Sequence, residues 1–268
     1  MSDAQIRLSF FATILAIMTL WELIAPRRAL TQSKLRRWGA NLSLVVLDTL
    51  AVRFLVPITA IAVGAHTEAH GIGLLNQFQL SDGARLILTI AALDLIVYLH
   101  HLMFHAVPLL WRFHRVHHAD RDIDVTTGVR FHPIEIVISL GIKIAAIYVV
   151  GANPWAILIF EIILNSTAMF NHSNVRIPVT IDRVLRLLVV TPDMHRVHHS
   201  IVEIETDSNF GFNFPWWDRI FGTYQAQPKE GHLKMTIGLR YFQEAPIAKM
   251  GWILLSPFYA VKRSLFRG

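Results

Sequence analysis

The sequence contains 14 histidines in 268 residues, and most of them fall in clusters with a regular spacing. The first cluster reads HxxxH, and the second and third both read HxxHH. The clustered residues are His101 and His105, then His114, His117 and His118, and finally His195, His198 and His199. Positions i, i+3 and i+4 of a helix are neighbours on one face, so the imidazoles of each cluster project together. Such groups chelate zinc, iron, copper or nickel, and the spacing therefore predicts a metal site without fixing the metal.

Two isolated histidines are expected to join the clusters. His132 lies in Arg130-Phe-His-Pro, directly before an apolar run, and His172 follows another apolar run in Phe170-Asn-His-Ser. The resulting ten histidines would suit two metal ions with four or five nitrogens each. The four histidines expected to take no part are His66, His70, His100 and His232.

The composition indicates a membrane protein. Hydrophobic residues make up 53% of the chain and charged residues 16%, with a mean hydropathy of +0.44. A soluble domain carries about 25% charged residues. The net charge of +6 favours basic loops at anionic lipid headgroups over nucleic-acid binding. Because there is no cysteine, disulfides, cysteine-ligated zinc and iron–sulfur clusters are excluded within this chain.

Apolar runs of about the length needed to span a bilayer divide the chain. They cover residues 8–26, 42–63, 84–107, 134–150 and 155–170. The segments 27–38 and 109–130 are rich in arginine and lysine, which predicts that they face the cytoplasm together with the histidine clusters. A signal peptide is the alternative for the first run, but Asp3 offsets Arg7 and no small-residue cleavage site follows.

These patterns predict an all-α integral membrane protein. Four to five membrane helices would carry a cytoplasmic helical cap, formed mainly by residues 171–244, and this cap would hold the histidine-rich di-metal site. Residues 247–267 mix aromatic, aliphatic and basic side chains, which is typical of an amphipathic helix at the membrane interface.

The motifs between residues 94 and 224 resemble the fatty acid hydroxylase/sterol desaturase superfamily of membrane di-iron oxygenases with histidine boxes. The resemblance is carried by the three histidine clusters, by Arg130-Phe-His-Pro and Phe170-Asn-His-Ser-Asn, and by the closing segments Asn209-Phe-Gly and Trp217-Asp-Arg-Ile-Phe-Gly-Thr. It implies a non-haem centre of two Fe ions, O2 as cosubstrate, a membrane lipid as substrate and a separate electron-transfer protein as external electron donor. It also implies three regions: membrane helices in 1–83, a catalytic domain in 84–225 and an interfacial tail in 226–268.

The sequence thus predicts an oxidoreductase that hydroxylates or desaturates a membrane lipid such as a sterol or fatty acyl chain. Asp94, Asp193 and Asp218 are candidate acceptors for the N–H groups of the metal-bound imidazoles. A membrane metal-ion transporter, or another metal-binding membrane protein, is the alternative, and it would place its site near the middle of the bilayer. A zinc metalloprotease is disfavoured because the chain has no HExxH motif.

Overall fold

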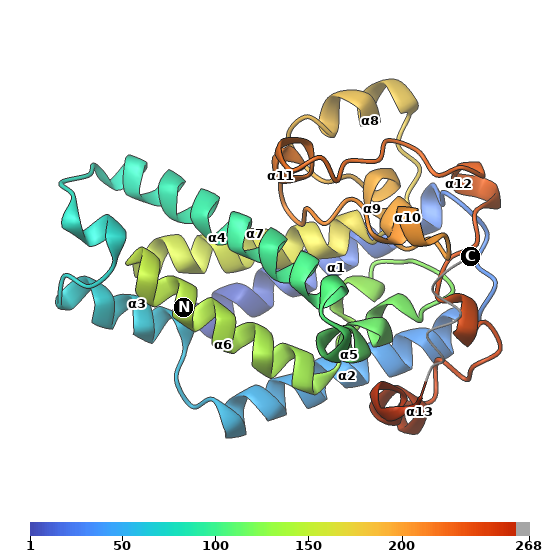
Figure 1. The fold of residues 1–268 in the computed structure, drawn as a ribbon, viewed down its shortest axis with the longest axis horizontal. Coiled ribbons are helices and arrows are strands. Elements are labelled where there is room, and N and C mark those ends of the chain that lie inside the picture. The colour runs from blue at the N-terminus through green and yellow to red at the C-terminus, as the bar shows by residue number, and fades with distance from the viewer. Residues whose placement is uncertain (261–268) are drawn as a thin grey trace.

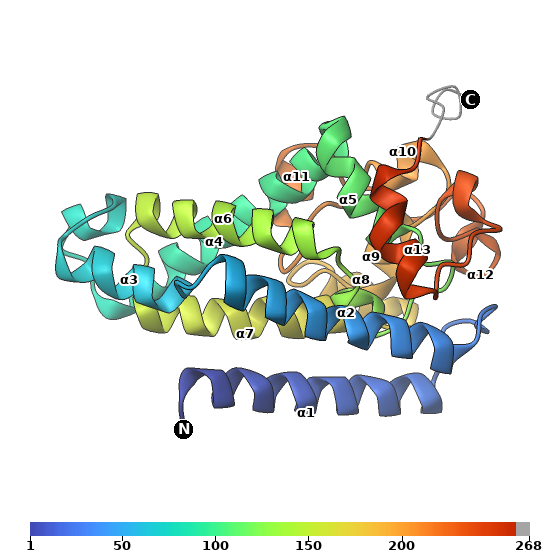
Figure 2. The same cartoon turned by 90° about the horizontal axis from the view of Figure 1, so that it is seen from below.

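The computed structural model describes residues 1–260, and no β-strand is found among them. Five helical segments are long and apolar enough to cross a membrane. They are α1 (Asp3–Ile24), α2 (Lys34–Leu55) continued by α3 (Ala60–Ala69) and η1 (Leu74–Gln77), α4 (Asp82–Ala106), α6 (Pro133–Val150) and α7 (Pro154–Asn171). These helices lie side by side along the longest axis of the molecule (Figures 1 and 2). The predicted fold class is confirmed, and the chain is a multi-pass membrane protein.

The second span differs from the uninterrupted apolar run 42–63 that the sequence predicted. Pro57 has no amide hydrogen and disfavours helical geometry at Val56, so α2 ends at Leu55. The chain then restarts as α3, where the Thr59 hydroxyl caps the helix by accepting from the amide of Ala62 at 3.1 Å. Residues 64–83, which separate the second and third apolar runs of the sequence, contain the rest of α3 and η1.

Three charged side chains inside the spans pair with one another. Glu161 of α7 pairs with Arg7 of α1 at 2.5 Å and with Lys143 of α6 at 2.7 Å. An ion in the membrane is stable only when it is paired in this way, so the triad ties three helices together. A cluster of buried apolar side chains, including Leu93, Ile147 and Phe160, packs α3, α4, α6 and α7 beside it.

Short helices form a cap at one end of the bundle (Figure 1). They are α5 (Pro108–His118), η2 (Thr127–Val129), α8 (Val179–Leu185), α9 (Pro192–His198), α10 (Glu203–Thr206), α11 (Trp216–Ile220), α12 (Gly231–Lys234), η3 (Arg240–Phe242), α13 (Met250–Leu255) and η4 (Ser256–Phe258). The predicted tail helix is represented by α13 and η4, and its last part, 261–268, lies outside the described residues.

Candidate metal centre

Nine of the ten histidines proposed as ligands converge at the junction between the bundle and the cap. The first group consists of His101, His105, His114, His118 and His198, and the second of His117, His172, His195 and His199. Within each group, one nitrogen of every ring lies within 4.8 Å of the others. The two groups are adjacent, since the ring centroids of His118 and His199 are only 4.6 Å apart.

Each HxxHH motif contributes to both groups. His114 and His118 join the first group while His117 joins the second, and His195 and His199 join the second group while His198 joins the first. The cause is helix geometry: with about 100° per residue, positions i and i+4 differ by about 40°, whereas i+3 lies about 60° to the other side of i. One motif therefore provides an i, i+4 pair to one group and its central histidine to the other.

Hydrogen bonds at Nδ1 fix the orientation of six of the nine rings. Four rings pair with backbone carbonyls: His101 with Phe210 at 2.8 Å, His117 with Arg130 at 3.2 Å, His172 with Ala168 at 2.7 Å and His198 with Ser208 at 2.7 Å. Two rings pair with carboxylates: His114 with Glu135 at 2.6 Å and His105 with Asp207 at 3.1 Å. An acceptor at Nδ1 leaves the Nε2 lone pair free for an ion, as in most protein metal sites.

The nitrogens that remain fit metal ions. The Nε2 atoms of His101, His114 and His198 are buried and have no hydrogen-bond partner within residues 1–260. Nε2 atoms also face one another across both groups, at 3.1 Å between His105 and His118 and at 3.0 Å between His117 and His172. Two nitrogens bound to one ion at about 2.1 Å and at right angles would be about 3.0 Å apart. The spacing is therefore the one that a shared ion requires.

The electrostatics of the cap also favour metal binding. Burial, and then the neighbouring imidazoles, lowers the pKa values of six histidines outside the membrane-spanning helices well below the usual value: His114, His117, His118, His195, His198 and His199. Burial lowers the pKa of His172 to about 3. The rings are therefore neutral at physiological pH, which is the state in which imidazole binds a metal.

His132, the tenth proposed ligand, lies outside both groups. It caps α6, where its Nδ1 accepts a hydrogen bond from the amide of Ile134 at 3.1 Å, and its Nε2 lies 3.3 Å from the carbonyl of Leu254. Pro133 begins the helix directly after it, so the capping geometry holds the ring away from the centre. The four other histidines, His66, His70, His100 and His232, also lie outside both groups.

The three aspartates proposed as acceptors have other hydrogen-bond donors. Asp94 accepts from the Trp217 indole at 2.7 Å, and Asp193 accepts from the guanidinium groups of Arg27 and Arg196. Asp218 contacts no histidine of the two groups directly and acts through the backbone of Phe210. Its carboxylate accepts from the amides of Phe210 and Gly211, both at 2.8 Å, and so holds the carbonyl of Phe210 toward His101.

The acceptors that contact the rings were not identified from the sequence. Glu135 is the only acidic residue in a largely apolar helix, and this was the signal that could have revealed it. Asp207 is in a polar loop and gave no such signal. Backbone carbonyls carry no sequence signature.

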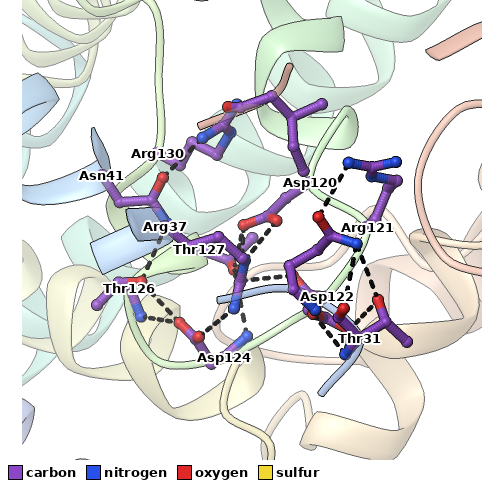
Figure 3. A network of polar contacts seen from close by, with 12 residues as sticks. Thr31, Arg37, Asn41, Asp120, Arg121, Asp122, Asp124, Thr126, Thr127 and Arg130 are labelled. Atoms are coloured by element: carbon purple, nitrogen blue, oxygen red, sulfur yellow. Dashed lines mark hydrogen bonds and ion pairs between the residues drawn. The ribbon is translucent and has the colours of Figure 1, made fainter. Parts of the chain in front are cut away.

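A buried polar network supports the second group from the side of α2 (Figure 3). The Arg37 guanidinium pairs with Asp120 through two bonds of 2.7 Å and with Asp124 at 2.5 Å. Burial alone would raise the pKa of Asp120, but the charge and hydrogen bonds of Arg37 outweigh it and hold the pKa below its ordinary value. Arg37 thereby fixes residues 120–130, the segment that follows the first HxxHH motif.

Residues 120–130 help to position the ligands His117 and His172 through two contacts. Arg130 donates to the carbonyl of Val116 at 2.9 Å and to Asn41 at 2.7 Å, while its own carbonyl accepts from His117. Gly128 packs so closely on α7 that a Cβ atom there would lie 2.4 Å from the carbonyl oxygen of Ala168, the acceptor for His172.

Comparison with known proteins gives the family. The family model described as "Fatty acid hydroxylase" matches residues 86–223, about half of the chain, so the chain belongs to the fatty acid hydroxylase family, and the predicted resemblance is confirmed. This range includes all nine histidines of the two groups. No solved structure matches the chain.

Several curated proteins are similar over the same region. Ornithine lipid hydroxylase OlsE of Rhizobium tropici is 31% identical over 50% of this chain and 39% of its own length. Human alkylglycerol monooxygenase is 24% identical over 54% of this chain and 32% of its own, and human cholesterol 25-hydroxylase is 27% identical over 50% and 48%. The similarity thus spans less than half the length of each of these relatives.

Proposed function

We propose that this protein uses O2 and two iron ions, held by the two histidine groups, to oxidise a C–H bond of a membrane lipid. For a hydroxylation, the lipid R–H, O2, two electrons and two protons give R–OH and water. The observation that carries this proposal is the pair of adjacent, buried, all-nitrogen groups at the end of the membrane helices. Placement at the helix ends disfavours the transporter alternative, which expects a site near the bilayer midplane.

The donor set and the relatives together support iron. Imidazole nitrogens suit zinc, iron, copper and nickel alike. Zinc has no redox chemistry, whereas the names of the relatives describe hydroxylases and monooxygenases. When bound, the iron pair would supply electrons to O2 and so make the oxidation possible.

The chain itself would orient the ions and exclude water. Glu135 and Asp207 hold the rings of His114 and His105 by their Nδ1 atoms, which sets the direction of the Nε2 lone pairs. Aromatic rings cover the centre: Phe210 lies 5.1 Å from His105, and Phe131 stacks on His117 at 4.7 Å between ring centroids. These apolar contacts keep bulk water from the reacting lipid.

The substrate class and the electron donor follow from the same proposal. The names of the relatives refer to an ornithine lipid, to alkylglycerols and to cholesterol, which supports a membrane lipid as substrate. The two electrons would come from a separate electron-transfer protein. The arginines of segments 27–38 and 109–130 support a cytoplasmic position of the centre. The family match at 86–223 supports residues 84–225 as the catalytic region, flanked by the membrane helices of 1–83 and the tail of 226–268.

The test is lipid analysis with isotopically labelled O2. Cells that express the protein should contain a lipid whose mass includes one heavy oxygen atom, or a lipid with one new double bond. Cells that express the His195→Ala variant at the same level should lack it. If the lipid profiles of the two strains are identical under conditions in which the wild-type protein is folded and loaded with iron, the proposed function is wrong.

A further inference from the structure

The short helices α8 and α11 have an inverted distribution of polar and apolar residues. Asp182 on α8 and Arg186 directly after it are buried and form an ion pair, and on α11 Asp218 is completely buried. The large apolar side chains of this region point outward instead. Seven of them are more than half exposed, namely Val179, Ile181, Val184, Leu187, Leu188, Ile220 and Phe221. We refer to these seven residues as the α8–α11 surface.

The two helices are bonded into a single unit, so this surface is continuous. The Trp216 indole on α11 donates to the carbonyl of Leu187 at 2.8 Å, and Arg219 donates to the carbonyl of Arg186 at 3.0 Å. An exposed apolar area of this extent is unusual for a surface in contact with water. We therefore expect the α8–α11 surface to be covered by an apolar partner.

The position of α11 along α4 identifies that partner. Asp94, which accepts from Trp217, is the thirteenth of the 25 residues of α4, and the ring of Tyr98 stacks on Phe221 at 5.4 Å. With a rise of about 1.5 Å per residue, Asp94 lies about 10 Å closer than the ligand His101 to the opposite end of α4. The unit therefore lies beside a membrane helix, next to its middle, and not beyond its end (Figure 1).

We propose that the α8–α11 surface is embedded in the lipid of the leaflet that contains the metal centre. Two exposed arginines, Arg183 and Arg219, lie among its apolar residues and can reach lipid phosphates. In this respect the segment 171–244 is not entirely a cap in water. Part of it is a monotopic membrane element, as amphipathic helices with one apolar face are. This inference does not depend on the reaction that the metal centre catalyses.

The absence of cysteine from the sequence allows a direct test in the full-length protein. Single variants Val184→Cys and Ile220→Cys, labelled with an environment-sensitive fluorophore and placed in phosphatidylcholine–phosphatidylglycerol nanodiscs, report contact with lipid. Leu20→Cys on α1 is the matched lipid-facing control, and Leu233→Cys on α12 is the matched control in water; the four residues are 62%, 65%, 58% and 63% exposed. All four side chains are on the surface, so labelling should leave the packing intact.

We expect the labels at Val184 and Ile220 to show the blue-shifted emission of the Leu20 label, and to be quenched as strongly by lipids that carry a spin label on the acyl chain. If either label has the emission and the weak quenching of the Leu233 label, the lipid assignment is wrong. Disulfide cross-linking of two copies through Val184→Cys, without quenching by lipid, would overturn it in favour of a dimer interface.

Discussion

Replacement of Arg37 by methionine tests how the membrane helices support the metal centre. Arg37 is 1% exposed, and its guanidinium binds Asp120, Asp124, the carbonyl of Asp122 and the hydroxyl of Thr127. The variant keeps the aliphatic volume but leaves two buried carboxylates without their cation. Removal of one partner of a buried ion pair costs about 3–5 kcal/mol. A domain is stable by only about 5–15 kcal/mol, so the variant should fold but should be markedly less stable.

The same change should weaken metal binding in the second group, because residues 120–130 position the acceptors of His117 and His172. Loss of such outer support typically costs about 10–100-fold in metal affinity. The assay is thermal unfolding in detergent together with metal content after dialysis against a weak chelator. Arg36→Met is the matched control, since Arg36 is the exposed neighbour on the same helix, and it should resemble the wild type in both measurements.

A second substitution separates the proposed cause from a simple loss of packing. If unpaired carboxylates are responsible, Asp124→Asn should be harmful in the wild type but should partly restore stability to Arg37→Met, so that the two effects are not additive. A variant Arg37→Met with wild-type stability and full metal content would refute the reasoning. If the destabilising effects of Arg37→Met and Asp124→Asn simply add in the double variant, the unpaired charge is not the cause.

Three further changes test individual contacts of the centre. Glu135→Gln keeps an acceptor for the neighbouring ring but removes its charge, and it should lower metal affinity by about 10–100-fold in a chelator competition. Gly128→Ala should destabilise the protein by about 1–3 kcal/mol in thermal unfolding, because its Cβ meets the backbone of α7, whereas Gly39→Ala, with open space around the Cβ, should be neutral or stabilising. His132→Ala should retain both ions, while His172→Ala should lose one by elemental analysis; loss of metal from the first variant alone would contradict the grouping of the histidines.

The sequence predicted the centre better than its surroundings, for a physical reason. Side chains at i, i+3 and i+4 of one helix must be neighbours, so local spacing alone assembled each HxxHH cluster. The assignment of His117 and His198 to different groups from their neighbours also follows from helix geometry, but only once two separate ions are considered. Proximity in the sequence was a poor guide for His132. This residue follows the second histidine cluster, but Pro133 begins α6 directly after it, so the His132 side chain caps that helix.

Long-range contacts were beyond the sequence. Arg37 is separated from Asp120 by 83 residues, and its cluster of basic neighbours suggested only a cytoplasmic loop. The inverted polarity of α8 was equally hidden, because the sequence shows which residues are apolar but not which of them face outward. In both cases the outcome depends on how distant helices pack, which local propensity does not determine.

The most direct test of the account is the number of iron ions in an active preparation. Protein purified after expression with iron should be assayed for lipid oxidation, and the same sample should be analysed for metal and for protein by amino-acid analysis. The two histidine groups predict two iron ions per chain. A fully active sample that contains one iron ion per chain, or none, would contradict the central claim that the two groups together form a di-iron centre.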